Sequence, residues 1–192
     1  MNFVFDVGNV LIDFRPMQLL TELFSDSSVR DRIYMTVFCG EEWVLLDKGQ
    51  MTHSQAQEIF CKREADLTYE ILLVMSHLRD LLTPINNTIA LLPKVLERGH
   101  RLFYLSNYHL ELRDYILDQY QFFKMFEGGV FSCDIHVTKP DPYIYRYFLK
   151  QYMLNPKDSI LFDDMIENVN AAIEIGMKGV IFDTAESLKP YL

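Results

Sequence analysis

Near its start the chain reads Phe3-Val4-Phe5-Asp6-Val7-Gly8-Asn9-Val10-Leu11-Ile12-Asp13. Residues 3–7 are apolar apart from Asp6, which is typical of a central parallel strand that helices cover on both faces. The strand ends on this carboxylate, and the chain then turns through Gly8 and Asn9. Open α/β sheets bind their ligands beyond the carboxyl ends of the strands, so we predict that Asp6 is the chemical centre of the protein.

The composition bounds the class of protein and its partners. The chain has 192 residues, 49% hydrophobic and 23% charged, which predicts an ordinary globular protein with one main core. A net charge of −9 argues against nucleic acid or an anionic membrane as a partner. Three scattered cysteines, no leader-like start and no membrane-length apolar run favour a cytoplasmic protein. We expect a small-molecule ligand and a monomer or weak dimer.

Helical patterns alone fill the part of the chain that follows the first strand. The expected helices cover about 17–25, 28–38 (begun by Ser27 or Ser28), 41–49, 52–65 with Thr52 as N-cap, and a segment from Thr68 onward. We predict no strand between 14 and 100. Turn-forming residues near 82–87 mark a boundary. The pattern therefore predicts an all-helical cap domain over 15–83, and a core domain made of residues 1–14 and 84–192.

Helices and strands alternate in the rest of the chain. The predicted helices cover 88–98, 109–121 and about 142–153, and the predicted strands cover 101–105, 129–132, 159–162 and 179–183. This alternation predicts an α/β fold with a doubly wound parallel sheet, because consecutive parallel strands are joined by right-handed helical crossovers.

Polar side chains follow three of these predicted strands. Asp6 ends the first, Ser106-Asn107 follow the second, and Asp163-Asp164 follow a buried Ile-Leu-Phe run, with Lys139 between the last two. Parallel strand ends meet at one edge of the sheet, so these distant groups are expected to converge. Adjacent carboxylates repel, and a divalent cation relieves that repulsion. Two acids, a hydroxyl, an amine and a hard cation together suit phosphoryl transfer to a carboxylate.

The order of these motifs resembles that of the haloacid dehalogenase-like (HAD) hydrolase superfamily. The matching segments are Asp6-Val7-Gly8-Asn9-Val10, Ser106-Asn107, Lys139-Pro140 and Asp163-Asp164-Met165-Ile166-Glu167-Asn168. With a helical cap after the first motif, the chain is similar to the subgroup that includes α-D-glucose-1-phosphate phosphatase. The resemblance implies a Rossmann-type core and a Mg²⁺-dependent phosphatase.

The resemblance also implies a role for each matching position. Asp6 would be the nucleophile that forms an aspartyl-phosphate, and Mg²⁺ would bind Asp6, the carbonyl of Gly8 and Asp164. Ser106, Asn107 and Lys139 would bind the phosphoryl group, with Ser106 and Lys139 also catalytic. Asp163 and Asn168 would not bind the metal themselves but would orient its ligands or Lys139.

One position departs from the family pattern. Most phosphatases of the superfamily carry a second aspartate two residues after the nucleophile, which protonates the leaving oxygen and later activates water; here that residue is Gly8. General acid and base catalysis commonly contributes about 10² to 10⁴ in rate. Its loss matters least for good leaving groups, which favours an anomeric sugar phosphate, an acyl phosphate or an aryl phosphate. Asp13, Asp183, His109 and His136 are weak candidates to replace it.

The substrate is predicted less sharply than the reaction. We expect a small phosphorylated metabolite, with a sugar phosphate as first choice, and Asn9, Trp43 and Lys48 as candidate substrate contacts. Trp43 alternatively anchors the cap helices. The histidines show no ligand spacing and are expected at the surface or in satisfied positions. Two other functions stay open: a 2-haloacid dehalogenase, which tolerates Gly8 but leaves Asp164 without a purpose, and a catalytically weak scaffold that binds a phosphorylated ligand.

Overall fold

The structure, a computed structural model, describes residues 1–192 and is built on one parallel sheet. Its strands are β1 (Asn2–Phe5), β4 (Arg101–Ser106), β5 (Gly128–Phe131), β6 (Ser159–Asp163) and β7 (Lys178–Ile181), in the order β5-β4-β1-β6-β7. Phe5 lies opposite Tyr104 on one side and Phe162 on the other, so β1 is central. The predicted doubly wound α/β fold is confirmed.

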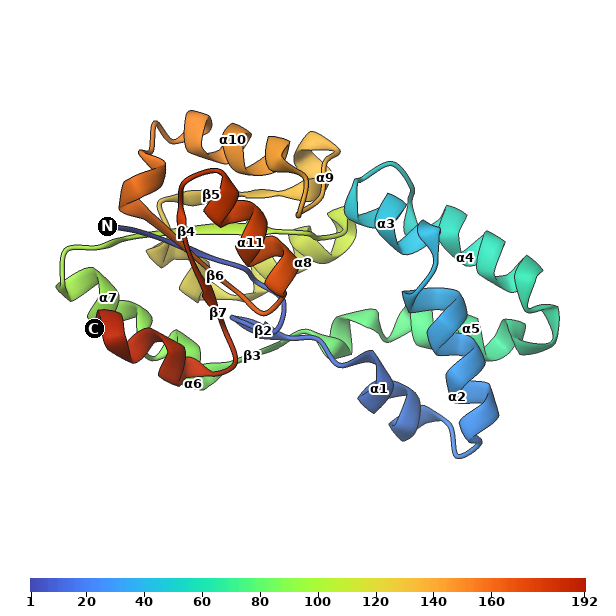
Figure 1. The fold of residues 1–192 in the computed structure, drawn as a ribbon. Coiled ribbons are helices and arrows are strands. Elements are labelled where there is room, and N and C mark those ends of the chain that lie inside the picture. Colours follow the sequence, from blue (N-terminus) through green and yellow to red (C-terminus); the bar gives the residue numbers. More distant parts are fainter.

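Alternate residues of β1 point into two separate apolar layers. Val4 packs in the layer beneath α10 (Pro142–Gln151) and α11 (Ile166–Glu174). Phe3 and Phe5 pack in the opposite layer, with α7 (Leu92–Glu97) and α8 (Leu110–Gln119). Figure 1 shows helices on both sides of the sheet. Because both faces are buried, the strand reads as a continuous apolar run rather than an alternating one.

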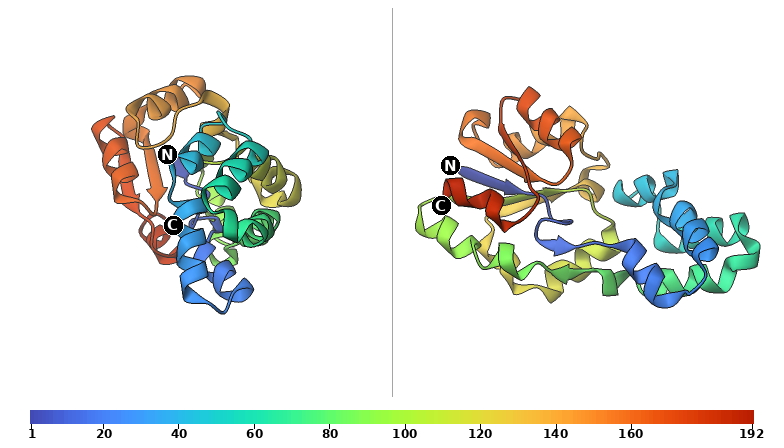
Figure 2. Two further views of the ribbon diagram at one scale, coloured as in Figure 1. Left: turned by 90° about the vertical axis from the view of Figure 1, so that its right-hand side faces the viewer. Right: turned by 60° about the horizontal axis from the view of Figure 1, so that its bottom comes forward.

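Helices make up nearly all of the chain between Pro16 and Leu81, which we call the insertion. They are α1 (Pro16–Leu23), α2 (Ser27–Ile33), α3 (Glu41–Asp47), α4 (His53–Arg63) and α5 (Thr68–Ser76), with a π-helical turn over Tyr34–Phe38 and short 3₁₀ turns over Ala65–Leu67 and Leu78–Leu81. They lie to one side of the sheet, away from both chain termini (Figure 2). Two short strands, β2 (Ile12–Asp13) and β3 (Thr83–Pro84), pair antiparallel where the chain leaves and returns.

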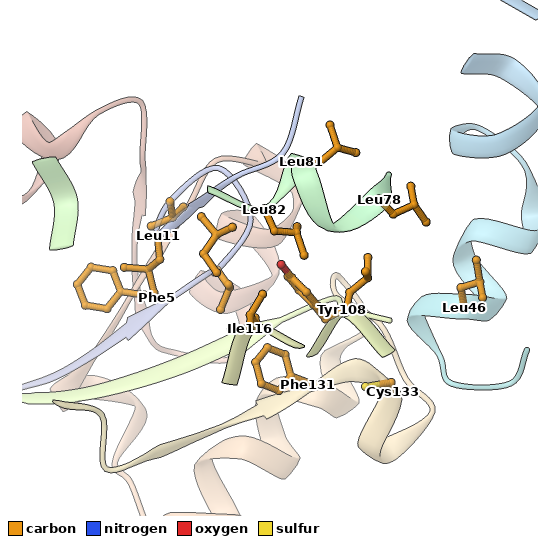
Figure 3. Close-up of a cluster of buried hydrophobic side chains, with 14 of the residues drawn as sticks. Phe5, Leu11, Leu46, Leu78, Leu81, Leu82, Tyr108, Ile116, Phe131 and Cys133 are labelled. Carbon is orange, nitrogen blue, oxygen red and sulfur yellow. The ribbon is translucent and has the colours of Figure 1, made fainter. Parts of the chain in front are cut away.

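Apolar packing runs without a break from the sheet into the insertion. Leu78, Leu81 and Leu82, at the end of the insertion, are buried in the same cluster as Phe5 and Ile116 (Figure 3). Leu46 of α3 belongs to this cluster as well. Because burial of each such side chain stabilises the fold by about 1.5–3 kcal/mol, this shared core holds the insertion against the sheet.

Several local predictions are confirmed and others are corrected. Thr52 caps α4 in a capping box with Gln55, as expected. The helix predicted over 28–38 begins at Ser27, with the side chain of Asp26 as its cap, and its second half, Tyr34–Phe38, is π-helical rather than α-helical. The predicted helix over 88–98 is divided into α6 (Asn86–Ile89) and α7, since Pro93 cannot donate a helical hydrogen bond and suits only the first turn.

Several short elements remain in the fold. The segment from 14 to 100 does contain one strand, the two-residue β3, which its Thr-Pro sequence did not predict. In the core, α9 (Ser132–Ile135) follows β5, and 3₁₀ turns cover Gln121–Met125, Pro156–Asp158 and Ala185–Tyr191. None of the helices has both the length and the apolar character needed to span a bilayer.

Candidate active site

Three strand ends bring polar side chains to one point. Asp6 follows β1 directly, Ser106 is the last residue of β4, and Asp163 is the last residue of β6. The Ser106 hydroxyl donates to Oδ1 of Asp6 over 2.6 Å, and the amide nitrogen of Val7 lies 2.7 Å from the same oxygen. All three side chains are nearly buried. The parallel sheet thus fixes one carboxylate oxygen of Asp6 from two sides.

Lys139 joins the two carboxylates that end neighbouring strands. Its ammonium group lies 3.0 Å from Oδ1 of Asp6 and 2.5 Å from Oδ2 of Asp163. Burial lowers the pKa of Lys139, but the attraction of Asp163 and Asp6 outweighs it, and the pKa stands above its ordinary value. Lys139 is therefore a permanently charged group inside the site.

Asp163 is fully buried and has no free oxygen. Its Oδ1 accepts from the amide of Met165 and from Nδ2 of Asn168, both over 2.9 Å, while Oδ2 faces Lys139. These contacts hold the Asp163 carboxylate between Asn168 and Lys139.

Asn107 fixes the main chain of Lys139 rather than presenting its amide to a ligand. Its Oδ1 accepts from the Lys139 amide over 2.7 Å, and its Nδ2 donates to the Lys139 carbonyl over 3.0 Å. This reciprocal pair links the ends of two segments that lie far apart in the sequence. Since the Lys139 side chain is 1% exposed, this link sets where its charge is presented.

Asp164 and Asn9 form the rim of the site. Nδ2 of Asn9 donates to Oδ2 of Asp164 over 3.0 Å, and Oδ1 of Asn9 accepts from the Phe14 amide over 3.1 Å. Asn9 has a φ of 55°, a left-handed conformation that asparagine tolerates better than most residues. The Gly-Asn turn therefore brings an amide donor onto the second acid of the Asp-Asp pair.

The three acids form a group with the donor chemistry of a hard cation. Asp6, Asp163 and Asp164 each offer an oxygen within 4.8 Å of the others. Burial raises the pKa of Asp6, with Lys139 opposing it, and burial also raises the pKa of Asp164. Since Asp163 is already saturated by its partners, Asp6 and Asp164 are the two acids left to bind a cation. A divalent ion fits because it would keep both carboxylates charged in this buried place.

A cavity of about 210 Å³ opens directly above this group. Sheet and insertion both line it: Asp6, Gly8, Asn9, Ser106, Asn107, Tyr108, His109, Leu112, Lys139, Asp164, Met165 and Asn168 from the core side, and Phe14, Trp43, Asp47 and Leu82 from the insertion and its edges. Its floor is charged and its walls are largely apolar and aromatic. Such a lining suits a small ligand with one anionic end.

Two of the three predicted substrate contacts line the cavity, and the third does not. Asn9 and Trp43 line the cavity, but Lys48 does not, and its carbonyl accepts from Nδ1 of His136 over 2.7 Å. Of the weak candidates to replace the missing acid, Asp13 pairs with Arg15 over 2.8 Å and lies outside the cavity, as do Asp183 and His136. Only His109 reaches it.

Asp47 is an acid of this cavity that the sequence did not single out, and His109 was named there only as a weak candidate to replace the missing acid. The expectation that the histidines lie at the surface or in satisfied positions is wrong for His109, which is 1% exposed and whose Nε2 makes no hydrogen bond. Burial lowers its pKa well below the ordinary value. Asp47 stands four residues after Trp43 on α3, and this i, i+4 spacing was the signal that both face the same way.

A family model identifies the family of the chain, and two fungal proteins resemble it over most of its length. A model of the haloacid dehalogenase-like hydrolases matches residues 1–176. The chain is 23% identical to sesquiterpene phosphatase astK of Aspergillus oryzae over 177 residues, which cover 92% of this chain and 87% of that protein. It is 22% identical to drimenol cyclase drtB of Aspergillus calidoustus over 98% of this chain, and it spans only 35% of that longer protein.

Solved structures agree on the fold. A HAD family enzyme from Bacteroides thetaiotaomicron, in complex with magnesium and inorganic phosphate, matches with a TM-score of 0.69 at 19% identity and covers 93% of this chain and 91% of its own. An L-2-haloacid dehalogenase from Xanthobacter autotrophicus with covalently bound chloropropionic acid matches with a TM-score of 0.69 at 16% identity, over 98% and 80%. With a family model matching most of its length, the chain belongs to the haloacid dehalogenase-like hydrolases.

Proposed function

We propose that this hydrolase is a Mg²⁺-dependent phosphatase that acts on a small phosphorylated metabolite through an aspartyl-phosphate on Asp6. The observation that carries the proposal is the environment of the Asp6 carboxylate. Ser106 and Lys139 hold one of its oxygens over 2.6 and 3.0 Å, at the floor of a cavity that Asp164 also lines. A carboxylate fixed in this way is oriented to attack a phosphorus atom placed above it.

The chain's own residues divide the work of phosphoryl transfer. Asp6 attacks phosphorus, and the Ser106 hydroxyl and the Lys139 ammonium bind the phosphoryl oxygens on which negative charge lies. Asp163 and Asn168 keep Lys139 in place, and Asn107 fixes its main chain. Asp6, the carbonyl of Gly8 and Asp164 would hold Mg²⁺, which supplies a positive charge that brings the phosphate and the carboxylate together.

The insertion acts as the cap over this site, with the boundaries predicted at residues 15–83. Trp43 and Asp47 of α3 line the same cavity as the nucleophile, which supports that role. A cap that closes the cavity excludes water from the reacting atoms and selects the leaving group.

The substrate class is the finer part of the proposal. Trp43 and Tyr108 present aromatic surface to the cavity, which suits the apolar face of a sugar ring, in line with the predicted sugar phosphate. The same surface suits a short isoprenoid chain, and the relative astK is described as a sesquiterpene phosphatase. A panel of substrates therefore includes glucose-1-phosphate, glycerol phosphate and farnesyl phosphate.

A dehalogenase is the second candidate, favoured by Gly8 at the position of the usual acid and by the likeness to a haloacid dehalogenase. The Asp164 carboxylate at the cavity opposes it, because displacement of halide needs no metal ligand there. A scaffold that binds a phosphorylated ligand without turnover is opposed by the complete set of Asp6, Ser106 and Lys139.

One experiment separates these functions. The protein is incubated with p-nitrophenyl phosphate and the substrate panel, with Mg²⁺ or with EDTA, and in parallel with 2-chloropropionate. We expect phosphate release that requires Mg²⁺ and is lost in Asp6→Asn. Chloride release without added metal, with no phosphate release, would establish the dehalogenase instead. Binding of a phosphorylated ligand without turnover in the wild type would establish the scaffold.

A further inference from the structure

The proposed reaction lacks a proton donor at the usual place. Gly8 has no side chain to protonate the leaving oxygen, and none of the residues assigned so far is free to do so: Asp6 is the nucleophile, Asp164 a metal ligand, and Asp163 is saturated by hydrogen bonds. One acid that lines the cavity remains without a role. It is Asp47, at the end of α3 in the insertion.

We propose that Asp47 is the general acid and base of the reaction, replacing from the insertion the aspartate that is absent at Gly8, and that His109 is a residue that positions it. This inference rests on the proposed phosphatase function. It assigns a catalytic residue that does not belong to any of the motifs that identify the family in this chain.

Asp47 and His109 meet across the boundary between insertion and core. Nε2 of His109 lies 3.4 Å from Oδ1 of Asp47, although the hydrogen-bond geometry is not satisfied and Nε2 has no other partner. The side chains are 17% exposed for Asp47 and 2% for His109. Both line the cavity that contains Asp6. The Asp47 side chain therefore has a buried imidazole as one neighbour and is partly exposed in the cavity that contains Asp6.

His109 is itself held firmly. Its ring lies 4.2 Å from the Trp43 ring, centroid to centroid, and its Nδ1 lies 3.1 Å from Nε2 of His53 on α4. Because Nδ1 is engaged with His53, Nε2 is the nitrogen that turns to Asp47. The imidazole therefore lies beside the Asp47 carboxyl, with Nε2 3.4 Å from Oδ1.

The main chain around Asp47 is seated on the core. The Ser132 hydroxyl donates to the Asp47 carbonyl, and His136 Nδ1 lies 2.7 Å from the Lys48 carbonyl. Gly49 follows with a φ of +60° and packs so closely that a Cβ would stand 2.7 Å from the Cys133 carbonyl oxygen. None of these contacts uses the Asp47 side chain. Asp47→Asn therefore keeps these main-chain contacts with the core and removes only the ionisable carboxyl group.

The electrostatic setting agrees with this geometry. Burial, followed by repulsion from Asp6, raises the pKa of Asp47 to about 7, with Lys139 opposing the rise. A carboxyl with a pKa close to neutrality donates and accepts protons with comparable ease. His109 has its pKa lowered well below the ordinary value by burial, so it stays neutral beside Asp47.

In the proposed reaction, Asp47 gives up a proton in the first step and takes one back in the second. In the first, an Asp6 oxygen forms a bond to phosphorus while the bond to the leaving oxygen breaks; that oxygen keeps the electron pair and takes the proton of Asp47, and the alcohol departs. In the second, water attacks the phosphorus and gives a proton to the Asp47 carboxylate, while the bond to Asp6 breaks and its electrons return to the Asp6 carboxylate. Inorganic phosphate departs, and Asp47 is again protonated.

The consequence is a dependence on the leaving group that only an acid produces. With Asp47 in place, the gap at Gly8 no longer limits the enzyme to good leaving groups. For Asp47→Asn we expect kcat/KM for glycerol phosphate, whose alkoxide leaving group needs a proton, to fall by about 10² to 10⁴, and kcat/KM for phenyl phosphate to fall less. We expect kcat/KM for p-nitrophenyl phosphate, whose leaving group needs no proton, to stay within about threefold.

The second step gives an independent readout. With p-nitrophenyl phosphate, Asp47→Asn should release one equivalent of nitrophenolate in a burst and then turn over slowly, because water is no longer activated and the phosphoenzyme accumulates. His109→Gln should give the same leaving-group dependence in milder form and add nothing in the Asp47→Asn background, since it acts through Asp47. Glu41→Gln, an exposed acid on the same helix, should leave all rates unchanged.

A rescue variant separates loss of the acid from a general loss of activity in Asp47→Asn. A Cβ at Gly8 would meet no atom within 4 Å, so the main chain there leaves space for a side chain to begin. Gly8→Asp in the Asp47→Asn background should restore the hydrolysis of glycerol phosphate. An equal loss for all substrates, or no loss for any, overturns the role of Asp47. A wild type that releases no phosphate from any substrate overturns the proposed function itself, so the two failures are told apart.

Discussion

The two sides of the cavity are built by different means. On the sheet side, Asp6, Ser106 and Asp163 each stand at the end of a parallel strand, and short hydrogen bonds and ion pairs hold them. On the insertion side, Trp43 and Asp47 stand on a helix of seven residues whose position depends on apolar packing and a few main-chain contacts. In the proposed reaction, the sheet side would bind the phosphoryl group and the insertion side would bind the leaving group. The proposed nucleophile and the proposed general acid thus stand on separately anchored parts.

The largest expected effect is on the sheet side. Asp6→Asn removes the nucleophile while keeping the shape, so phosphate release should fall by more than about 10⁴-fold. Acid-quenched reactions with labelled substrate should trap phosphate on the wild type and none on the variant. Asp31→Asn, an exposed acid on α2, serves as the control and should behave as the wild type. Label retained on Asp6→Asn would place the nucleophile elsewhere.

The next effect is on the stability of the sheet side. Lys139→Met leaves Asp6 and Asp163 buried without their cation, and removing one partner from a buried ion pair typically costs about 3–5 kcal/mol. We expect urea unfolding in the absence of metal to show a loss of this size. Lys157→Met, at an exposed position, should change the free energy of unfolding by less than about 0.5 kcal/mol. Equal stability of the two variants would mean that the pair contributes nothing.

A smaller effect is expected at the contact between Gly49 of the insertion and Cys133 of the core. Gly49→Ala forces a left-handed residue to carry a Cβ against Cys133, at an expected cost of about 1–3 kcal/mol. Gly99→Ala is the matched control, since Gly99 has a φ of +75° but no atom within 4 Å of a new Cβ. Gly49→Ala should therefore unfold at lower urea than Gly99→Ala, and its KM for phenyl phosphate should rise. Identical unfolding curves would show that the contact with Cys133 does not constrain the insertion.

The smallest effect is the pH dependence of stability at Asp47. Its folded pKa of about 7 lies above the ordinary value of 3.8, so the folded state binds a proton that the unfolded state has lost between these pH values. Stability from this group therefore falls as pH rises from about 4 to 7 and stays low above that. Asp47→Asn should be more stable than the wild type above pH 7, by on the order of 2 kcal/mol, and equal to it near pH 4. Urea titrations of the metal-free protein across this range measure the difference.

The sheet side was predictable from the sequence because strand ends are local features. Asp6, Ser106 and Asp163 each follow an apolar run, and the rule that parallel strands end at one edge brings them together without knowledge of the packing. The insertion side followed no such rule. His109 was named only as a weak candidate for the missing acid, and Asp47 was not named, because their meeting depends on how α3 packs against the core. Lys48, the neighbour of Asp47, was chosen instead and lies outside the cavity.

The fold shows the same division. The strands were predicted to within one or two residues, since buried runs of valine, leucine and phenylalanine have few alternatives. The helix expected over 88–98 and the one expected over 28–38 differed because of Pro93 and Asp26, whose effects compete with hydrophobic periodicity. The two-residue strand β3 had no sequence signal, as its pairing with Ile12 and Asp13 is purely tertiary.

The seating of Asp47 through Ser132, His136 and Gly49 has a consequence for the order of events in a catalytic cycle. With Asp47 as the proposed acid, the proton source is in place only while α3 rests on the core, so a movement of α3 away from the core would also withdraw it. In such a state the molecule would keep its nucleophile but would have no means to expel an alkoxide or to activate water. Such an arrangement would safeguard a phosphorylated aspartate against premature hydrolysis and make docking itself the trigger.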